Sequence, residues 1–429
     1  MALKASWVIF LVALVVRLIG LAVYGVDQRG DAVEYDRLAF NLSQGHGYSL
    51  SLSAPFTRTT QREPTYPLVV ALIYRLVGHQ PFLVILLQCL LGSVVCLVMY
   101  ALARLLYDDR RVAVLAGLLN AVYVPIAIFN LRLLSETVAT GLVAVIAYQL
   151  VRLLATERNW PQYLFLGLAT GLLILTKLIF LFLPVFMVLA LMGSASGARR
   201  VGKPLACLAL IGLMVLPWCV FTRTVHGSPA MGNSVRMGAN LYIRVMNDGM
   251  KGPLAMRVEL YQHLRELEEQ GIPVSTLNAD AVRRALEIIR AHPIRYLAGV
   301  ALEIRDLWRF GLDASEIDVT APMTLQGPKG TLFRSVKAAF QVLNVAVLVT
   351  GVLGFLVKVT TRSSLVMLLI LYATLMFALV SCALPRHNVP ILPLMLVFSS
   401  QWIVWCRDRR QGVDVRPATT RRVLMSTGA

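Results

Sequence analysis

Long apolar stretches separated by short polar links follow one another along most of the chain. A helix needs roughly 20 apolar residues to cross a bilayer, and ten stretches approach or exceed that length. They lie at Trp7–Tyr24, Pro81–Leu106, Val112–Phe129, Leu133–Leu154, Trp160–Thr176, Leu178–Met192, Pro204–Phe221, Val336–Val357, Ser364–Val380 and Asn388–Trp405. The pattern therefore predicts an all-α integral membrane protein with about ten transmembrane helices.

Two polar segments between these stretches are long enough to have structure of their own. The first, Val26–Tyr66, precedes the apolar stretch Pro67–Gly78, which is short and contains Arg75. A stretch of this kind favours a helix that lies in the membrane interface or re-enters it. We therefore expect short interfacial helices in and after the first polar segment.

The second polar segment covers residues 223–335. Helical periodicity is present at Leu254–Gln270, Asn278–Ala291 and Pro293–Phe310. Gly271 is typical of a helix end, and Pro293 is typical of a helix start. This segment predicts a small helical cap outside the membrane.

Composition agrees with a membrane protein. Hydrophobic residues make up 57% of the 429 positions, and the mean hydropathy is +0.69. A soluble domain of this size does not need so large an apolar share. The net charge of +18 comes from 41 Lys and Arg against 23 Asp and Glu. No basic, aromatic-interleaved soluble segment is present, so the charge does not indicate nucleic-acid binding.

The short links place most of their cations on one side when the predicted spans alternate. These cations are Lys4, Arg104, Arg110, Arg111, Arg152, Arg158, Arg199, Arg200, Lys203, Lys358, Arg362, Arg407, Arg409 and Arg410. The positive-inside rule makes that side cytoplasmic. Both termini are then inside, and the links at residues 26–66, 130–132, 177, 223–334 and 384–386 are outside.

The first span and the cysteines have simple interpretations. No small-residue cleavage site follows the first apolar run, so an uncleaved signal anchor is favoured. The six cysteines all lie in apolar stretches without metal-binding or redox spacing, which is typical of packing residues.

Four charged residues, distant in the chain, reach the same outer face in this topology. They are Asp31, Glu136, Lys177 and Arg386. Carboxylates and cations delivered to one membrane boundary by separate helices indicate a charged substrate handled there.

Asp31 follows the first span, and helical spacing places Glu34 and Tyr35 on its face. A carboxylate near a low-dielectric boundary can act as a general base on a hydroxyl. The alternative is a helix N-cap in a surface loop.

The other members also have two interpretations. Glu136 either has a functional role or complements the dipole of its helix. Lys177, at a hairpin tip, either binds substrate or reaches toward lipid headgroups. Arg386 either binds a phosphate through two parallel hydrogen bonds or anchors the last helix. Arg17, inside the first span, either holds helices together or faces the same cavity.

Several catalytic classes lack support. The chain contains no GxGxxG, no Walker A lysine, no HExxH and no internal repeat, so ATP-driven and zinc-protease chemistry are not indicated. The histidines are scattered, and neither His46 nor His387, the two nearest the predicted site, is assigned to a metal. We expect no cofactor; a divalent cation is the alternative, disfavoured because no Asp-x-Asp pair is present.

An ordered set of motifs spans most of the chain. It comprises Arg17, Gly30-Asp31, Tyr35, Ala39, Leu42, Gly45-His46-Gly47-Tyr48, Arg62-Glu63-Pro64-Thr65-Tyr66-Pro67, Leu134-Ser135-Glu136, Leu175-Thr176-Lys177, Gly238-Ala239-Asn240-Leu241-Tyr242, His292-Pro293, Tyr296-Leu297, Trp308, Arg386, Pro390 and Pro393. This set resembles the C-type (GT-C) membrane glycosyltransferases that depend on polyprenyl phosphate. They include the protein O-mannosyltransferases and the lipid A aminoarabinose transferase.

The resemblance implies inverting transfer of a sugar from a polyprenyl-phosphate carrier to an acceptor outside the cytoplasmic membrane. Asp31 matches the catalytic acid position of the family. Protein mannosyltransferases have Glu after that Asp, whereas Ala32 follows here, which makes protein O-mannosylation less favoured. A lipid or polysaccharide acceptor, or another protein modification, remains open.

The chemistry of such a transfer fits the residues. It needs a base for the acceptor, cations for the departing phosphate and an apolar groove for the prenyl tail. We assign the base to Asp31, and the cations to Lys177 and Arg386, with Arg62 as a further phosphate ligand. Glu136 is expected to orient the acceptor or a cation, and Glu34, Tyr35 and Arg17 are supporting candidates.

Two other functions remain as alternatives. A polytopic transporter or lipid flippase also fits many helices and the intramembrane Arg17, but inverted repeats and paired broken helices are not visible. A non-catalytic lipid-binding scaffold leaves the outer carboxylates unexplained.

The predicted organisation has four parts. Residues 1–222 form an N-terminal transmembrane catalytic module with the outer loop 26–66, and residues 223–335 form the extracytoplasmic helical loop. Residues 336–406 form the C-terminal transmembrane helices, and residues 407–429 form a basic cytoplasmic tail. The protein is expected in the cytoplasmic (inner) membrane of the cell envelope, with its active site facing the periplasm or exterior.

Overall fold

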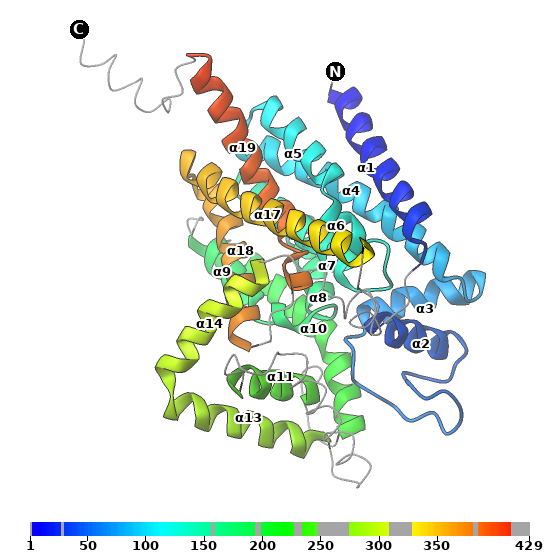
Figure 1. Cartoon of the computed structure of the whole chain (residues 1–429). Helices are drawn as coiled ribbons and strands as arrows, with labels where there is room; N and C mark the ends of the chain where they lie inside the picture. Colours follow the sequence, from blue (N-terminus) through cyan, green and yellow to red (C-terminus); the bar gives the residue numbers. More distant parts are fainter. Residues whose placement is uncertain are drawn as a thin grey trace.

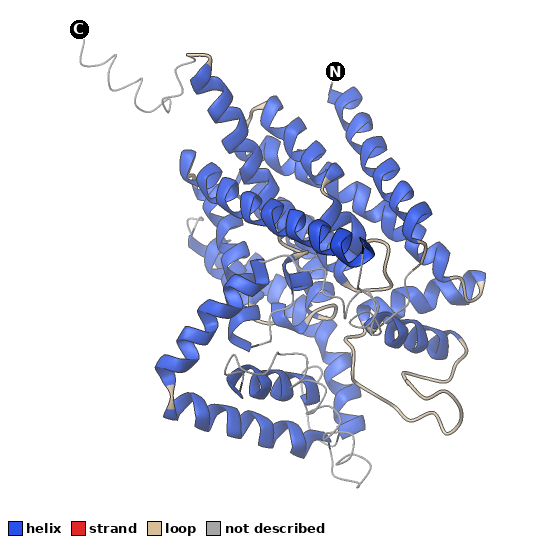
Figure 2. Ribbon diagram, in the orientation of Figure 1, coloured by secondary structure: helices blue, strands red, loops and turns tan. Residues whose placement is uncertain are grey.

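The computed structural model describes residues 2–26, 30–155, 159–193, 199–226, 234–246, 274–308, 328–380 and 385–412. Within these ranges the structure is helical and contains no strand, apart from one isolated antiparallel bridge between Ser49 and Arg58 (Figure 2). The predicted all-α fold is thus confirmed for the part of the chain that the structure describes.

The helices follow the predicted apolar stretches closely (Figure 1). In chain order they are α1 (Ala2–Tyr24), α2 (Asp31–Ser43), α3 (Thr65–Val77), α4 (Pro81–Tyr107), α5 (Arg110–Val122), α6 (Val124–Phe129), α7 (Glu136–Ala155), α8 (Trp160–Ile174), η1 (Leu178–Phe180), α9 (Leu183–Gly193), α10 (Arg199–His226), α11 (Ser234–Met246), α13 (Val274–Ala291), α14 (Pro293–Trp308), α17 (Pro328–Val357), α18 (Thr361–Val380), η2 (Pro385–Asn388) and α19 (Leu392–Arg410).

Six helices in the described residues are long and apolar enough to cross a membrane. The qualifying segments are Lys4–Tyr24, Pro81–Tyr107, Glu136–Leu154, Gly202–Val225, Ser335–Val357 and Thr361–Val380. The other four predicted stretches also contain helices, but these are short, broken or more polar. The membrane-protein class is therefore supported, and the total of ten spans stays a prediction.

The predicted span Val112–Phe129 is not one helix. It divides into α5 and α6 at Tyr123, whose backbone is extended. The cause is Pro125, because proline has no N–H to donate to the carbonyl four residues earlier. That carbonyl, of Ala121, instead accepts a hydrogen bond from the Arg17 guanidinium at 3.4 Å.

Two further predicted spans begin with a short 3-10 turn. In the stretch Leu178–Met192, the 3-10 turn η1 comes first and the α-helix α9 follows. At the last stretch, the 3-10 turn η2 precedes the α-helix α19. Prolines near both helix starts explain these interruptions, since a proline fits the first turn of a helix but not its interior.

The basic links gather at one end of the helices. The Arg111 guanidinium, at the start of α5, makes two hydrogen bonds of 2.7 and 2.8 Å to the Asp408 carboxylate at the end of α19. Lys358, directly after α17, donates to the Tyr107 carbonyl, and Arg362, in the first turn of α18, donates to the Leu105 carbonyl. In Figure 1 this end is at the top with the N-terminus, and α11 and α13 lie at the bottom.

The first polar segment forms α2 and a loop that leads to α3. The two helices pack together, and Tyr66, Val70 and Tyr74 of α3 are buried. The opposite face of α3 exposes Leu72 and Leu76. An exposed apolar face fits the predicted interfacial position of this helix, which stays a prediction.

The second polar segment contains α11, α13 and α14 within its described parts. The predicted helices Asn278–Ala291 and Pro293–Phe310 correspond to α13 and α14. Leu254–Gln270 lies outside the described residues, as does the tail beyond residue 412, while α19 itself extends to Arg410. The extracytoplasmic location of the segment and the four-part division of the chain stay predictions.

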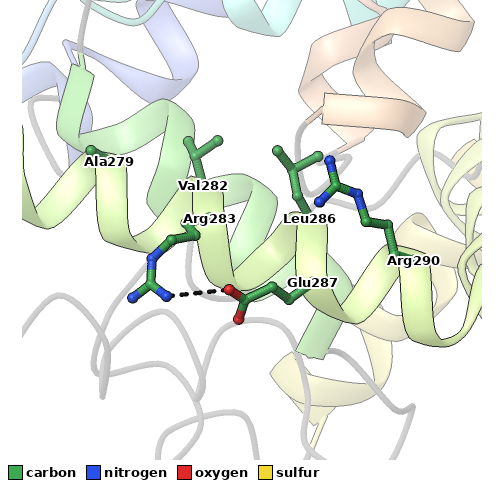
Figure 3. A pocket seen from close by; sticks show the side chains of 6 residues that line it. All are labelled: Ala279, Val282, Arg283, Leu286, Glu287 and Arg290. Atoms are coloured by element: carbon green, nitrogen blue, oxygen red, sulfur yellow. Dashed lines mark hydrogen bonds and ion pairs between the residues drawn. The ribbon is translucent and has the colours of Figure 1, made fainter.

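A cavity of about 540 Å³ lies along α13 (Figure 3). Its lining residues are Ala279, Val282, Arg283, Leu286, Glu287 and Arg290. Arg283 pairs with Glu287 at 3.2 Å along the helix surface. None of these six residues is among the predicted site residues.

Candidate active site

Asp31 lies between two guanidinium groups. One Nη atom of Arg62 lies 2.5 Å from Asp31 Oδ1, and the other donates to Oδ2 at 3.1 Å. Arg386 Nη2 donates to the same Oδ2 at 2.6 Å. The carboxylate is thus held by one arginine from the first polar segment and one from the turn before α19.

Arg386 also connects Asp31 to the second carboxylate. Its Nε lies 3.9 Å from Glu136 Oε1, and Lys177 Nζ donates to that same oxygen at 3.2 Å. Arg386 and Lys177 are each about 14% exposed at the side chain, and Glu136 only 4%. The structure therefore joins all four residues that the topology predicted at one face.

Glu34 completes the arrangement, since its Oε2 accepts a hydrogen bond of 2.7 Å from Arg62 Nε. We call the six residues Asp31, Glu34, Arg62, Glu136, Lys177 and Arg386 the charged cluster. Three carboxylates and three cations are balanced in it, so its formal charge is close to zero. An anionic ligand that joins it competes with the carboxylates for the same cations.

Helix ends and turns deliver these side chains. Asp31 is the first residue of α2, after Gly30, whose φ of +60° favours glycine. Glu136 is the first residue of α7, and Lys177 lies where α8 gives way to η1. Backbone groups at such ends are not committed to a helix ladder, so a turn can direct the side chain toward the cluster.

The backbone around Arg62 and Lys177 is tied to neighbouring elements. Tyr48 Oη donates to the Arg62 carbonyl at 2.9 Å. The Thr65 amide donates to the Leu175 carbonyl at 3.1 Å, which joins the start of α3 to the turn that carries Lys177. These bonds fix two cations of the cluster relative to each other.

The Arg62 guanidinium lies over the ring of Tyr35. The guanidinium carbon lies 4.9 Å from the centre of the Tyr35 ring, a distance at which a cation is attracted to the ring face. The Tyr35 hydroxyl and Ser135 Oγ are 3.3 Å apart. Burial raises the pKa of Tyr35, so this residue stays a neutral phenol.

Arg62 keeps its charge despite burial. Burial alone would lower the pKa of this guanidinium, but the Asp31 and Glu34 carboxylates beside it raise the pKa well above its usual value. A cation fixed in this way can attract a phosphate at any physiological pH.

Arg17 does not contact the charged cluster directly. Its buried guanidinium donates to Asn130 Oδ1 at 2.7 Å and to the carbonyls of Ala13 and Ala121. Asn130 in turn donates to Thr137 Oγ1 at 2.9 Å, one residue after Glu136. These contacts match the interpretation in which Arg17 holds helices together, and not the one in which it faces the cavity of the site.

Buried amide side chains that sequence reasoning did not select hold backbone segments that lead to the cluster residues. Gln88 donates to the carbonyls of Asn130 and Arg132 and accepts from Tyr66 Oη at 2.7 Å. Asn388, two residues after Arg386, donates to the Leu307 carbonyl at 2.8 Å. Amide side chains inside apolar spans were the available signal, since a buried amide needs hydrogen-bond partners.

Within the described residues, no three His, Cys, Asp or Glu side chains lie close enough together to hold a metal ion. Glu136 Oε2 is buried and has no hydrogen-bond partner among those residues. The expectation of no cofactor remains a prediction.

Comparison with known families supports the resemblance. Residues 61–221 match the family model described as dolichyl-phosphate-mannose-protein mannosyltransferase. The matched range contains Arg62, Glu136 and Lys177 of the charged cluster. No curated protein sequence matches the chain significantly.

A solved structure shares the fold. Archaeal oligosaccharyltransferase AglB from Archaeoglobus fulgidus, in complex with an inhibitory peptide and a dolichol-phosphate, matches with a TM-score of 0.54 and 13% identity. The match covers 100% of this chain and 52% of AglB, so the chain spans about half the length of that protein.

ArnT from Cupriavidus metallidurans bound to undecaprenyl phosphate matches with a TM-score of 0.44 and 16% identity, over 94% of this chain and 77% of ArnT. The family match, together with the fold shared with AglB, confirms the predicted resemblance to C-type membrane glycosyltransferases. The transporter alternative is not favoured.

Proposed function

We propose that this chain transfers a sugar, with inversion, from a polyprenyl-phosphate donor to an acceptor at the outer face of the cytoplasmic membrane. The observation that carries the proposal is the charged cluster: a carboxylate held by two arginines, beside a second carboxylate held by lysine. The matched family takes its name from dolichyl-phosphate-mannose, a donor of this class.

The cations have the placement that a departing phosphate needs. Arg386 Nη2 lies 2.6 Å from Asp31 and its Nε lies 3.9 Å from Glu136, so one guanidinium faces both carboxylates. In the proposed complex, phosphate oxygens replace these carboxylates as acceptors for Arg386, Arg62 and Lys177. The charge that develops on the leaving phosphate is then stabilised by groups already in position.

Exchange of partners gives Asp31 its role. While Asp31 accepts hydrogen bonds from two arginines, its lone pairs are occupied. Once the phosphate attracts those arginines, Asp31 can take the proton from an acceptor hydroxyl. The acceptor oxygen then bonds to the anomeric carbon from the face opposite the phosphate. The carbon–oxygen bond to the phosphate breaks, and the polyprenyl phosphate leaves with the electron pair.

Glu136 has a different environment and a different proposed role. It is almost fully buried and its Oε1 is held by Lys177. A carboxylate fixed in this way orients the lysine and, through it, the donor phosphate or the acceptor. Glu34 and Tyr35 are proposed to hold Arg62.

A transfer assay tests the proposal directly. The purified protein in lipid nanodiscs is supplied with polyprenyl-phosphate sugars labelled in the sugar, and both labelled acceptor and free polyprenyl phosphate are measured. The candidate acceptors come from comparing the glycolipids and glycoproteins of a strain lacking this protein with those of its parent. Movement of the intact labelled lipid between leaflets, without cleavage of the sugar–phosphate bond, would instead indicate a flippase.

A further inference from the structure

Arg386, which reaches both carboxylates of the charged cluster, lies on the four-residue turn η2. So short a turn has little hydrogen bonding of its own: the Val389 amide donates to the Arg386 carbonyl at 3.2 Å, and the Ile391 amide donates to the Asn388 carbonyl at 2.9 Å. The position of the guanidinium therefore depends on what holds the turn from outside.

Two residues of this turn besides Arg386 contact other helices: the His387 ring stacks on Phe377 of α18, with ring centroids 4.8 Å apart, and Asn388 reaches α14. Asn388 is fully buried, and its Nδ2 donates to the Leu307 carbonyl at 2.8 Å. Its Oδ1 has no hydrogen-bond partner among the described residues. One donated bond thus fixes the amide, and the bond ends on the last turn of α14.

The end of α14 is a suitable anchor. The last four carbonyls of a helix have no donor within the helix, and Leu307 and Trp308 are both buried. Asn388 donates to the Leu307 carbonyl, and Asn344 of α17 donates to the Trp308 carbonyl at 3.1 Å. Asn344 is itself fixed by the Tyr123 hydroxyl, which donates to its Oδ1 at 2.6 Å.

The other end of α14 is also fixed. The Tyr296 hydroxyl donates to the Leu379 carbonyl at the end of α18 at 2.8 Å. Arg244 of α11 donates to the carbonyls of Tyr296 and Ala378 and lies 3.8 Å from Glu303. Bonds at both ends make α14 a brace between the end of α18 and the turn that carries Arg386.

We infer that Asn388 is a positioning residue that sets the Arg386 guanidinium against Asp31 and Glu136 by tying its turn to the end of α14. The inference rests on the proposed function, because it concerns how the donor phosphate is bound. It also assigns a task to α14: the helix supports a phosphate ligand without contacting the donor.

A matched pair of variants separates this role from helix capping. Asn388→Ala and Asn344→Ala each remove one amide donor from a carbonyl at the same end of the same helix, but only Asn388 shares a turn with Arg386. Binding of undecaprenyl phosphate to the protein in nanodiscs is measured for both, with thermal unfolding as the check on folding. Both variants should unfold at lower temperature.

Only Asn388→Ala should weaken binding of undecaprenyl phosphate, on the order of tenfold, which corresponds to one lost hydrogen bond. In transfer assays it should raise the KM for the donor while leaving the KM for the acceptor unchanged. Asn388→Ser, which keeps a shorter donor, should lose less affinity, and it provides the measurement if Asn388→Ala does not fold. Adding Asn388→Ala to Arg386→Ala should cause no further loss, since the two act through one group.

The outcomes separate the two proposals. Wild-type affinity in Asn388→Ala, or in Asn388→Ser where Asn388→Ala does not fold, overturns the role of Asn388 alone, and so does a loss that multiplies fully with that of Arg386→Ala. Equal loss in Asn344→Ala also overturns it, because the effect would then belong to the helix end. Failure of the wild-type protein to bind the lipid phosphate overturns the donor assignment and the inference together.

Discussion

Arg386 Nη2 donates to Asp31 Oδ2 over 2.6 Å, although 355 positions separate the two residues in the chain. The contact pairs a candidate phosphate ligand with the candidate base. In the proposed mechanism, a phosphate takes the place of Asp31 as the partner of Arg386, and Asp31 then becomes available to accept a proton. Because the two residues have different proposed roles, mutation of each should change a different step, either donor binding or proton transfer.

Asp31→Asn should abolish transfer and retain donor binding. The amide keeps the shape of the carboxylate but removes the charge that accepts the proton, so the turnover number should fall by about 10²–10⁴-fold. The measurement is the turnover number of the purified variant with a polyprenyl-phosphate sugar, beside undecaprenyl phosphate binding. Glu34→Gln is the matched control, since Glu34 also pairs with Arg62 but is not assigned to the proton. An unchanged turnover number in Asp31→Asn removes Asp31 from the chemistry.

Lys177→Ala and Arg386→Ala should weaken donor binding as well as slow transfer. A cation facing the phosphate stabilises the bound donor and the leaving group alike. Arg386→Lys should restore only part of the affinity, because an ammonium cannot make the two-pronged contact. The double alanine variant should lose less than the product of the single losses, since both cations face Glu136 Oε1. Wild-type affinity in both single variants would make these residues interface anchors.

Arg17→Met should destabilise the protein while sparing the chemistry of the folded fraction. The substitution leaves the Ala121 carbonyl and Asn130 Oδ1 without the Arg17 donor, and an unsatisfied buried group costs about 1–3 kcal/mol. Thermal unfolding in detergent measures the loss, and turnover is expressed per folded molecule. Lys4→Ala, at the exposed start of the same helix, should leave unfolding unchanged. A lost turnover number with normal unfolding would place Arg17 in the reaction instead.

Arg111→Ala should lower the unfolding temperature slightly and leave transfer unchanged. Arg111 holds the nearly buried Asp408 carboxylate with two hydrogen bonds and thereby joins α5 to α19. A loss near 1 kcal/mol shifts the midpoint by about 1 °C in a chain of this length, because the entropy of unfolding grows with the number of residues. Arg110→Ala, on the neighbouring exposed position, should have a smaller effect. Equal shifts in the two variants would show that Asp408 gains little from Arg111.

Cysteine labelling tests the assignment of sides. Ser51→Cys, in the loop after α2, should react with a membrane-impermeant maleimide in intact cells, and Gln411→Cys, after α19, should react only after the membrane is permeabilised. The reason is the Lys and Arg excess at the end of the helices that carries Arg111, Lys358 and Arg362. The parent protein without the added cysteine gives the background from its native cysteines. Labelling of position 411 in intact cells would reverse the topology.

The sequence by itself determined the helical membrane class and the position of the charged residues along the chain. Apolar stretches of spanning length are a local property, because a helix satisfies its own backbone in lipid. Alternation of spans then placed Asp31, Glu136, Lys177 and Arg386 at one face, and the structure brings these four side chains into contact. The periodicity of α2 also placed Glu34 and Tyr35 beside Asp31, and both contact Arg62.

Only the tertiary structure decided which side chains pair and which helices break. Hydropathy did not show that the predicted span is divided by Pro125. The break leaves the Ala121 carbonyl without a donor in its own helix, and the donor comes from Arg17 on another helix. Nor could it distinguish the two interpretations of Arg17 or select Asn388, whose partner is the end of a helix 81 positions earlier. Hydrogen bonds between distant segments depend on how the helices pack in space. A pattern of residues along the chain does not give the distances between helices.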